Sequence, residues 1–169
     1  MTALFGAVAV FISFILTVWV GELGVYLPLA VWTVFAMGNF FGIRSGIWLA
    51  VFAATLSGLT YDRGAAGFLE PFAAAVFWIP VFWKGRRYVF GEAGSWFPGS
   101  ITGMTAAFIL YGSAIAGGGW RYSGAWMSML ANVLFCGMTG IFILPVIMWL
   151  TVLCGRKLGL DLARPGAKK

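Results

Sequence analysis

The chain of 169 residues contains no histidine, and only 9% of its residues are charged. Soluble domains carry about a quarter charged residues, so the sequence predicts an integral membrane protein throughout, with no separate soluble domain. The absence of histidine removes the commonest proton shuttle and the usual metal ligand of membrane enzymes. We therefore expect no cofactor, no metal and no enzymatic activity.

Cysteine is scarce as well. The two cysteines, Cys136 and Cys154, fall on one predicted helix, where a rise of 1.5 Å per residue separates them by about 27 Å. That distance excludes a disulfide within the chain, and no base or partner thiol lies nearby in the sequence. Both are predicted to be free apolar thiols.

Apolar residues are abundant, at 62% of the chain. They form six runs that predict an all-α bundle of six transmembrane helices over residues 1–154, followed by a basic cytoplasmic tail, residues 155–169. The predicted helices cover residues 2–20, 25–41, 46–61, 65–83, 96–116 and 125–150. The last apolar run continues to Cys154, so its helix is expected to tilt or to kink at Pro145.

The basic residues indicate the orientation of this bundle. With the N-terminus in the cytoplasm, cytoplasmic segments hold nine of the eleven basic residues, and only Arg63 and Arg121 are outside. The nine are Arg44, Lys84, Arg86, Arg87, Arg156, Lys157, Arg164, Lys168 and Lys169. This positive-inside pattern predicts that both termini are cytoplasmic. Because these basic residues lie at the predicted cytoplasmic membrane surface, the net charge of +6 indicates contact with membrane lipid rather than with nucleic acid.

A ladder of small residues runs through the third predicted helix at every fourth position: Gly46, Ala50, Ala54 and Gly58. This spacing places small side chains on one helix face, which allows close approach of another helix in the membrane. We expect the ladder to form a helix-packing or partner interface and its helix to be central in the bundle. Gly99 and Gly103 repeat the same spacing in the fifth predicted helix.

The polar candidates within the apolar runs are few. Glu70 precedes Pro71 and has two interpretations: a functional intramembrane carboxylate, or a first-turn acid in headgroup water if the helix begins at Pro71. We favour the second interpretation. Asn39 and Asn132 are expected to form interhelical hydrogen bonds, and contact with a ligand is the alternative. Aromatic residues near span ends, among them Trp19 and Tyr26, are expected to be interface anchors.

Several of these segments resemble the bacterial rod shape-determining membrane protein MreD family. The matching pieces are Pro28-Leu29, the basic turn Gly42-Ile43-Arg44-Ser45, the ladder from Gly46 to Gly58, and Ala66-Gly67-Phe68-Leu69. Near the C-terminus they are Ala131-Asn132-Val133-Leu134, Leu144-Pro145 and Arg156-Lys157. Family members often carry an acid at the end of the ladder. Here that position is Gly58, with Asp62 one turn further on.

The resemblance implies a non-enzymatic scaffold of the cell-elongation machinery in the bacterial inner membrane. Its partner would be an MreC-like bitopic protein, and through it the peptidoglycan synthase complex. It also implies a fold similar to the substrate-binding S-components of energy-coupling-factor transporters. The alternative is therefore a small solute-binding transporter component with a pocket at its outer face. The residues that could line such a pocket are Tyr61, Glu70, Trp120, Tyr122 and Asn132.

Overall fold

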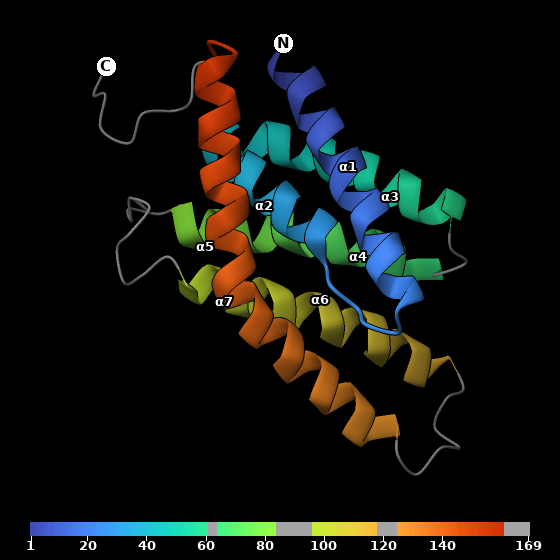
Figure 1. Ribbon diagram of the computed structural model, residues 1–169. Coiled ribbons are helices and arrows are strands. Elements are labelled where there is room, and N and C mark those ends of the chain that lie inside the picture. The colour runs from blue at the N-terminus through green and yellow to red at the C-terminus, as the bar shows by residue number, and fades with distance from the viewer. Residues whose placement is uncertain (61–63, 84–95, 118–124, 161–169) are drawn as a thin grey trace.

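A computed structural model describes residues 1–60, 64–83, 96–117 and 125–160. In these residues the chain forms six helices and no strand, as predicted (Figure 1). Five of them are α1 (Thr2–Glu22), α2 (Leu29–Phe41), α3 (Ile43–Thr60), α6 (Trp96–Ala116) and α7 (Ala125–Lys157). The remaining helix is made of three consecutive stretches: α4 (Gly64–Phe72), the π-helical η1 (Ala73–Trp78) and α5 (Ile79–Trp83).

Four of the described helices are long and apolar enough to cross a membrane, namely α1, α3, α6 and α7. These helices indicate a multi-pass membrane protein. Helix α2 has only 13 residues, or about 20 Å at 1.5 Å per residue, and the apolar stretch Ala66–Phe82 is also shorter than a full span. Full membrane crossing by these two helices remains a prediction.

Helix α2 occupies the centre of the bundle (Figure 1). All residues from Ala30 to Gly38 are buried, and every other helix contacts α2. A helix that is apolar all round is stable only when it is covered on all sides. The prediction that the ladder helix is central was therefore wrong: α3 buries one side and leaves Trp48 and Val51 exposed.

Helices α2 and α3 are joined by a turn at Gly42. Its φ of 98° lies in the left-handed region that favours glycine. The reversal brings Gly38 and Gly46 together, so that a Cβ added to Gly46 would lie 3.2 Å from the Gly38 Cα atom. Because the turn is so short, α3 begins at Ile43, and Arg44 belongs to its first helical turn rather than to a loop.

Helix α7 continues for 33 residues with Pro145 inside it. It changes direction along its length (Figure 1), as the sequence predicts for a helix with an interior proline. Proline has no N–H for the bond to the preceding turn, and its ring displaces the carbonyl there, which bends a helix. Cys136 and Cys154 both lie on α7 and both are free, as predicted.

Candidate functional site

Glu70 lies inside a helix. Helix α4 begins at Gly64 and continues through Pro71, and the Glu70 side chain is only 5% exposed. The prediction that the helix starts at Pro71 and leaves Glu70 in headgroup water was therefore wrong. The backbone changes to π-helical geometry directly after Phe72, at Ala73, an irregularity of the kind that accommodates a nearby proline.

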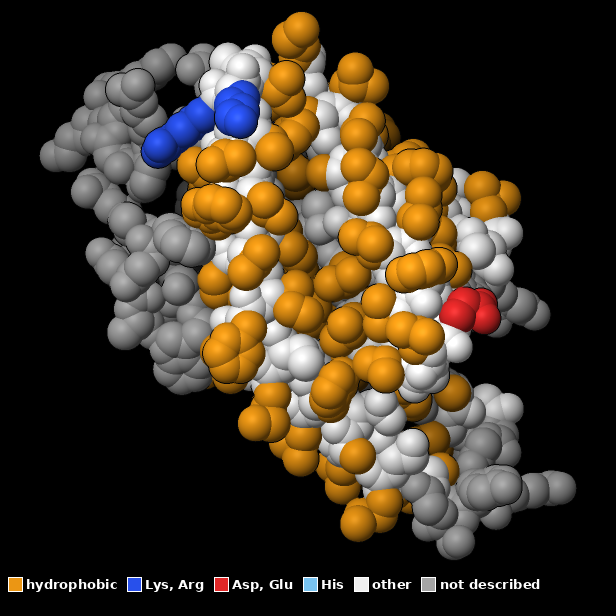
Figure 2. Space-filling model, in the orientation of Figure 1, with side chains coloured by type: hydrophobic (Ala, Val, Ile, Leu, Met, Phe, Trp, Pro, Cys, Tyr) orange, Lys and Arg blue, Asp and Glu red, His pale blue; other side chains and the backbone are white. Residues whose placement is uncertain are grey.

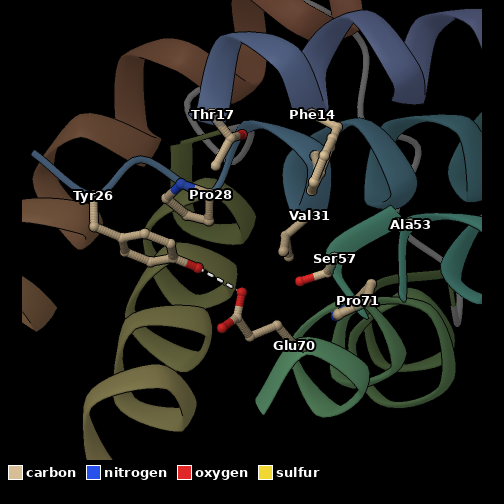
Figure 3. A pocket seen from close by; sticks show the side chains of 11 residues that line it. Phe14, Thr17, Tyr26, Pro28, Val31, Ala53, Ser57, Glu70 and Pro71 are labelled. Atoms are coloured by element: carbon tan, nitrogen blue, oxygen red, sulfur yellow. Dashed lines mark hydrogen bonds between the residues drawn. The ribbon is translucent and has the colours of Figure 1, made fainter. Parts of the chain in front are cut away.

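Tyr26 binds Glu70 directly. Its phenolic hydroxyl donates a hydrogen bond of 2.6 Å to Glu70 Oε2, and both side chains are buried (Figure 3). Tyr26 lies in the non-helical segment before α2, and its ring also packs edge-to-face on Tyr111 of α6. The prediction of Tyr26 as an interface anchor was wrong, because its hydroxyl is used inside the protein.

A small cavity adjoins this pair, between α1, α2, α3 and α4 (Figure 3). Its volume is about 30 Å³, and its polar lining includes Thr17 and Ser57 besides Tyr26 and Glu70. The Thr17 hydroxyl donates to the Ser13 carbonyl in its own helix. A space of this size accommodates about one water molecule, whereas pockets for drug-sized ligands measure about 300–1,000 Å³.

The small-residue ladder is packed over three of its four positions. Gly46, Ala50 and Ala54 are buried, and a Cβ atom added to Gly46 would contact the side chain of Ile79 in α5. Gly58 is exposed, with open space where a Cβ would be. No helix of the described residues packs on Gly58, and its assignment to a partner interface stays a prediction.

Gly99 and Gly103 form a close contact between α6 and α7. A Cβ at Gly99 would overlap the carbonyl of Gly140, and one at Gly103 would overlap the carbonyl of Cys136. The indole Nε1 of Trp32 in α2 donates to the Gly99 carbonyl at 3.2 Å. Both glycines are therefore used inside the bundle, where small residues allow helices to approach closely.

The remaining predicted site residues are not brought together. Asn132 Nδ2 donates to the Ser128 carbonyl one turn earlier in α7, so its predicted interhelical bond is wrong. The Nδ2 atom of Asn39 is buried and has no hydrogen-bond partner in the part of the chain that the structure describes. Asp62 lies outside the described residues, as do Tyr61, Trp120, Tyr122 and most of the basic tail.

The outer side of α7 presents an apolar surface that the sequence analysis did not single out. Its side chains recur every three or four residues, as one face of a helix requires, and all are exposed. We call this surface the α7 stripe; it consists of Met127, Leu130, Leu134, Met138, Phe142, Val146, Trp149 and Leu153.

Comparison of the chain with protein-family models, curated proteins and solved structures finds no match. The described residues alone therefore give the class of protein. They form an all-helical, multi-pass membrane protein with a buried carboxylate–tyrosine pair. The similarity to an S-component fold, implied by the MreD resemblance, remains a prediction.

Proposed function

We propose that this chain is a non-enzymatic scaffold of the bacterial inner membrane, similar to MreD, that binds an MreC-like single-span protein. In this role it belongs to the cell-elongation machinery and connects, through that partner, with the peptidoglycan synthase complex. The residue pattern shared with the MreD family supports the proposal. A second line of support comes from the surface of α7.

The α7 stripe is the observation that carries the proposal. From Met127 to Leu153 it extends about 39 Å at 1.5 Å per residue, more than the roughly 30 Å of a bilayer's hydrocarbon core. A partner helix that follows the bend of α7 can therefore lie along it for a complete membrane crossing. Met127 and Met138 supply flexible side chains that adapt to a neighbouring helix. The opposite side of α7 is held by the glycine contact with α6.

The cavity beside Glu70 is too small to be the solute pocket of the transporter alternative. Its volume of about 30 Å³ is a tenth or less of a typical small-molecule pocket, about 300–1,000 Å³. Native mass spectrometry of the purified protein should accordingly show no stoichiometric water-soluble ligand. Detection of such a ligand would favour the transporter component.

The partner site is tested by truncating three stripe residues together: Leu134→Ala, Met138→Ala and Phe142→Ala. The MreC-like protein of the same bacterium is co-expressed and recovered through a tag on this chain. A few residues near the centre of an interface supply most of its binding energy, and a combined loss of about 1.4 kcal/mol is tenfold in affinity, so we expect recovery to fall at least about tenfold.

A matched control truncates three exposed residues of α1: Leu4→Ala, Phe11→Ala and Ile15→Ala. These side chains are equally apolar but lie on another helix, so recovery should stay near that of the unmodified chain. Equal loss in both triple variants would show a general effect on the membrane-facing surface. Unchanged recovery in the α7 variant would exclude the stripe as the partner site.

A further inference from the structure

The polar groups inside this bundle lie beneath an apolar surface. Hydrophobic side chains cover most of the face shown in Figure 2. A polar group in such an interior needs a hydrogen-bond partner within the protein or an ordered water, because an unsatisfied group is costly. The cavity beside Glu70 brings several polar groups to one place.

Ser57 supplies the first of these groups. It is only 7% exposed and lines the cavity, and its oxygen points into that space from α3 (Figure 3). Thr55 and Thr60 of the same helix each donate to the carbonyl one turn earlier. The Ser57 hydroxyl makes no hydrogen bond with any residue that the structure describes. It therefore offers a donor and an acceptor to an occupant of the cavity.

Pro71 gives the cavity a second polar group. Proline has no N–H, so the Gly67 carbonyl one turn earlier in α4 lacks its α-helical donor. Gly67 also lines the cavity, and a glycine has only main-chain atoms to place there. In membrane helices, ordered waters and serine or threonine side chains take over bonds that a proline removes. Here a serine on α3 and space for a water adjoin the same carbonyl.

Glu70 contributes the third group. A carboxylate has about four acceptor positions on its two oxygens, and the bond from Tyr26 uses one of those on Oε2. Thr17, which also lines the cavity, gives its proton to the Ser13 carbonyl and keeps only acceptor capacity. Among the described lining groups, acceptors therefore outnumber donors. This balance favours an occupant that has two protons to donate.

The volume of the cavity limits the size of that occupant. The cavity measures about 30 Å³. A water requires at least about 10–15 Å³ of such space and about two to four polar partners, and both conditions are met here. Cavities that stay empty in proteins are lined by apolar groups, whereas polar groups line this one.

We propose that one ordered water occupies this cavity, donating to the Gly67 carbonyl and to the Glu70 carboxylate and accepting from Ser57 Oγ. The water takes the place of the N–H that Pro71 lacks. It joins α3 to α4, as Tyr26 joins the segment before α2 to α4. The site lies inside the bundle, so it does not depend on the partner proposed for the α7 stripe.

The direct test is an experimental structure of the unmodified full chain at a resolution that shows ordered water. We expect density for one water within about 2.5–3.0 Å of Ser57 Oγ, the Gly67 oxygen and a carboxyl oxygen of Glu70. An empty cavity would overturn the proposal, and so would a metal ion, which is recognised by its shorter distances to oxygen.

A second test detects the water in solution. X-ray pulses split water into hydroxyl radicals, which oxidise the side chains next to a trapped water. We expect Tyr26, which lines the cavity, to be oxidised faster than Trp32, which is fully buried elsewhere. Ser57→Val fills the space and removes a donor, so oxidation of Tyr26 should fall to the level of Trp32. Thr55→Val, on the exposed side of the same helix, should leave it unchanged.

The bond to Gly67 is tested by a double-mutant cycle, measured by chemical unfolding in detergent. Ser57→Ala should lower the equilibrium constant of folding about fivefold, the equivalent of one hydrogen bond of about 1 kcal/mol. Pro71→Ala restores an N–H for the Gly67 carbonyl, so in that background the effect of Ser57→Ala should be clearly smaller. Thr55→Ala is the control and should change the constant by less than about twofold in both backgrounds.

Equal effects of Ser57→Ala in the two backgrounds would overturn the proposal. Oxidation of Tyr26 that stays unchanged in a folded Ser57→Val protein would overturn it as well. If Ser57→Val or Pro71→Ala does not fold, the structure of the unmodified chain decides.

Discussion

At the scale of single residues, Glu70 is the most unusual feature of this protein. A carboxyl group inside an apolar bundle is costly unless its oxygens are hydrogen-bonded. Tyr26 provides such a bond from the segment before α2, and this bond connects that segment to α4. The pair therefore holds together parts of the chain that are distant in sequence.

A double-mutant cycle measures this connection. Tyr26→Phe removes only the hydroxyl and Glu70→Leu removes both carboxyl oxygens, so each single variant loses the hydrogen bond and the cycle measures the interaction between the two side chains. We expect Tyr26→Phe to destabilise the protein by about 1–3 kcal/mol, because a buried acceptor loses a donor. The coupling energy should be about 1–2 kcal/mol, measured by chemical unfolding in detergent. Strictly additive effects would mean that the hydrogen bond contributes nothing to stability.

At the scale of helices, the closest contact described is between α6 and α7. The backbones meet at Gly99 and Gly140, and again at Gly103 and Cys136. In lipid the hydrophobic effect does not drive helices together, so such close contact is a main source of their association. The bend of α7 allows its second half to reach α2 as well.

Gly99→Ala should separate α6 from α7, because the new Cβ would overlap backbone atoms that cannot rotate away. Overpacking of this kind costs about 1–3 kcal/mol, and here the obstacle is backbone, so we expect the upper end or failure to fold. Gly112→Ala is the matched control on the same helix, since nothing lies within 4 Å of its added Cβ. It should be neutral or stabilising by up to about 1 kcal/mol from helix propensity. Thermal unfolding in detergent distinguishes the two; equal stability would contradict the packing argument.

At the scale of the whole molecule, the helices surround α2, and the orientation of the bundle is still a prediction from charge. Glu22 and Arg44 are both exposed and lie at the ends of α1 and α3. If both termini are cytoplasmic, Glu22 faces outward and Arg44 faces the cytoplasm.

Cysteine labelling tests this orientation. A membrane-impermeant maleimide should label Glu22→Cys in intact spheroplasts and Arg44→Cys only after lysis. The unsubstituted chain, whose two cysteines lie within α7, is the baseline. The reverse labelling pattern would invert the topology and place Lys157 and Arg156 on the outer side.

Much of the architecture follows from the sequence alone. The number of helices, the long last helix with an interior proline and the free cysteines were all predicted correctly. These features depend on local composition and periodicity: an apolar run of sufficient length forms a helix in a membrane because its backbone must satisfy its own hydrogen bonds. The orientation and the MreD-like role remain predictions from the same local patterns.

Other features depend on contacts between distant segments. The burial of Glu70, the central place of α2 and the exposure of Gly58 were not predictable from the sequence. A small-residue ladder shows which helix face can be approached closely, but not how far along that face a neighbour extends. Likewise, a glutamate before a proline is compatible with either a helix end or a helix interior. Tyr26, on another segment, supplies a hydrogen bond that offsets part of the cost of burying this carboxyl group.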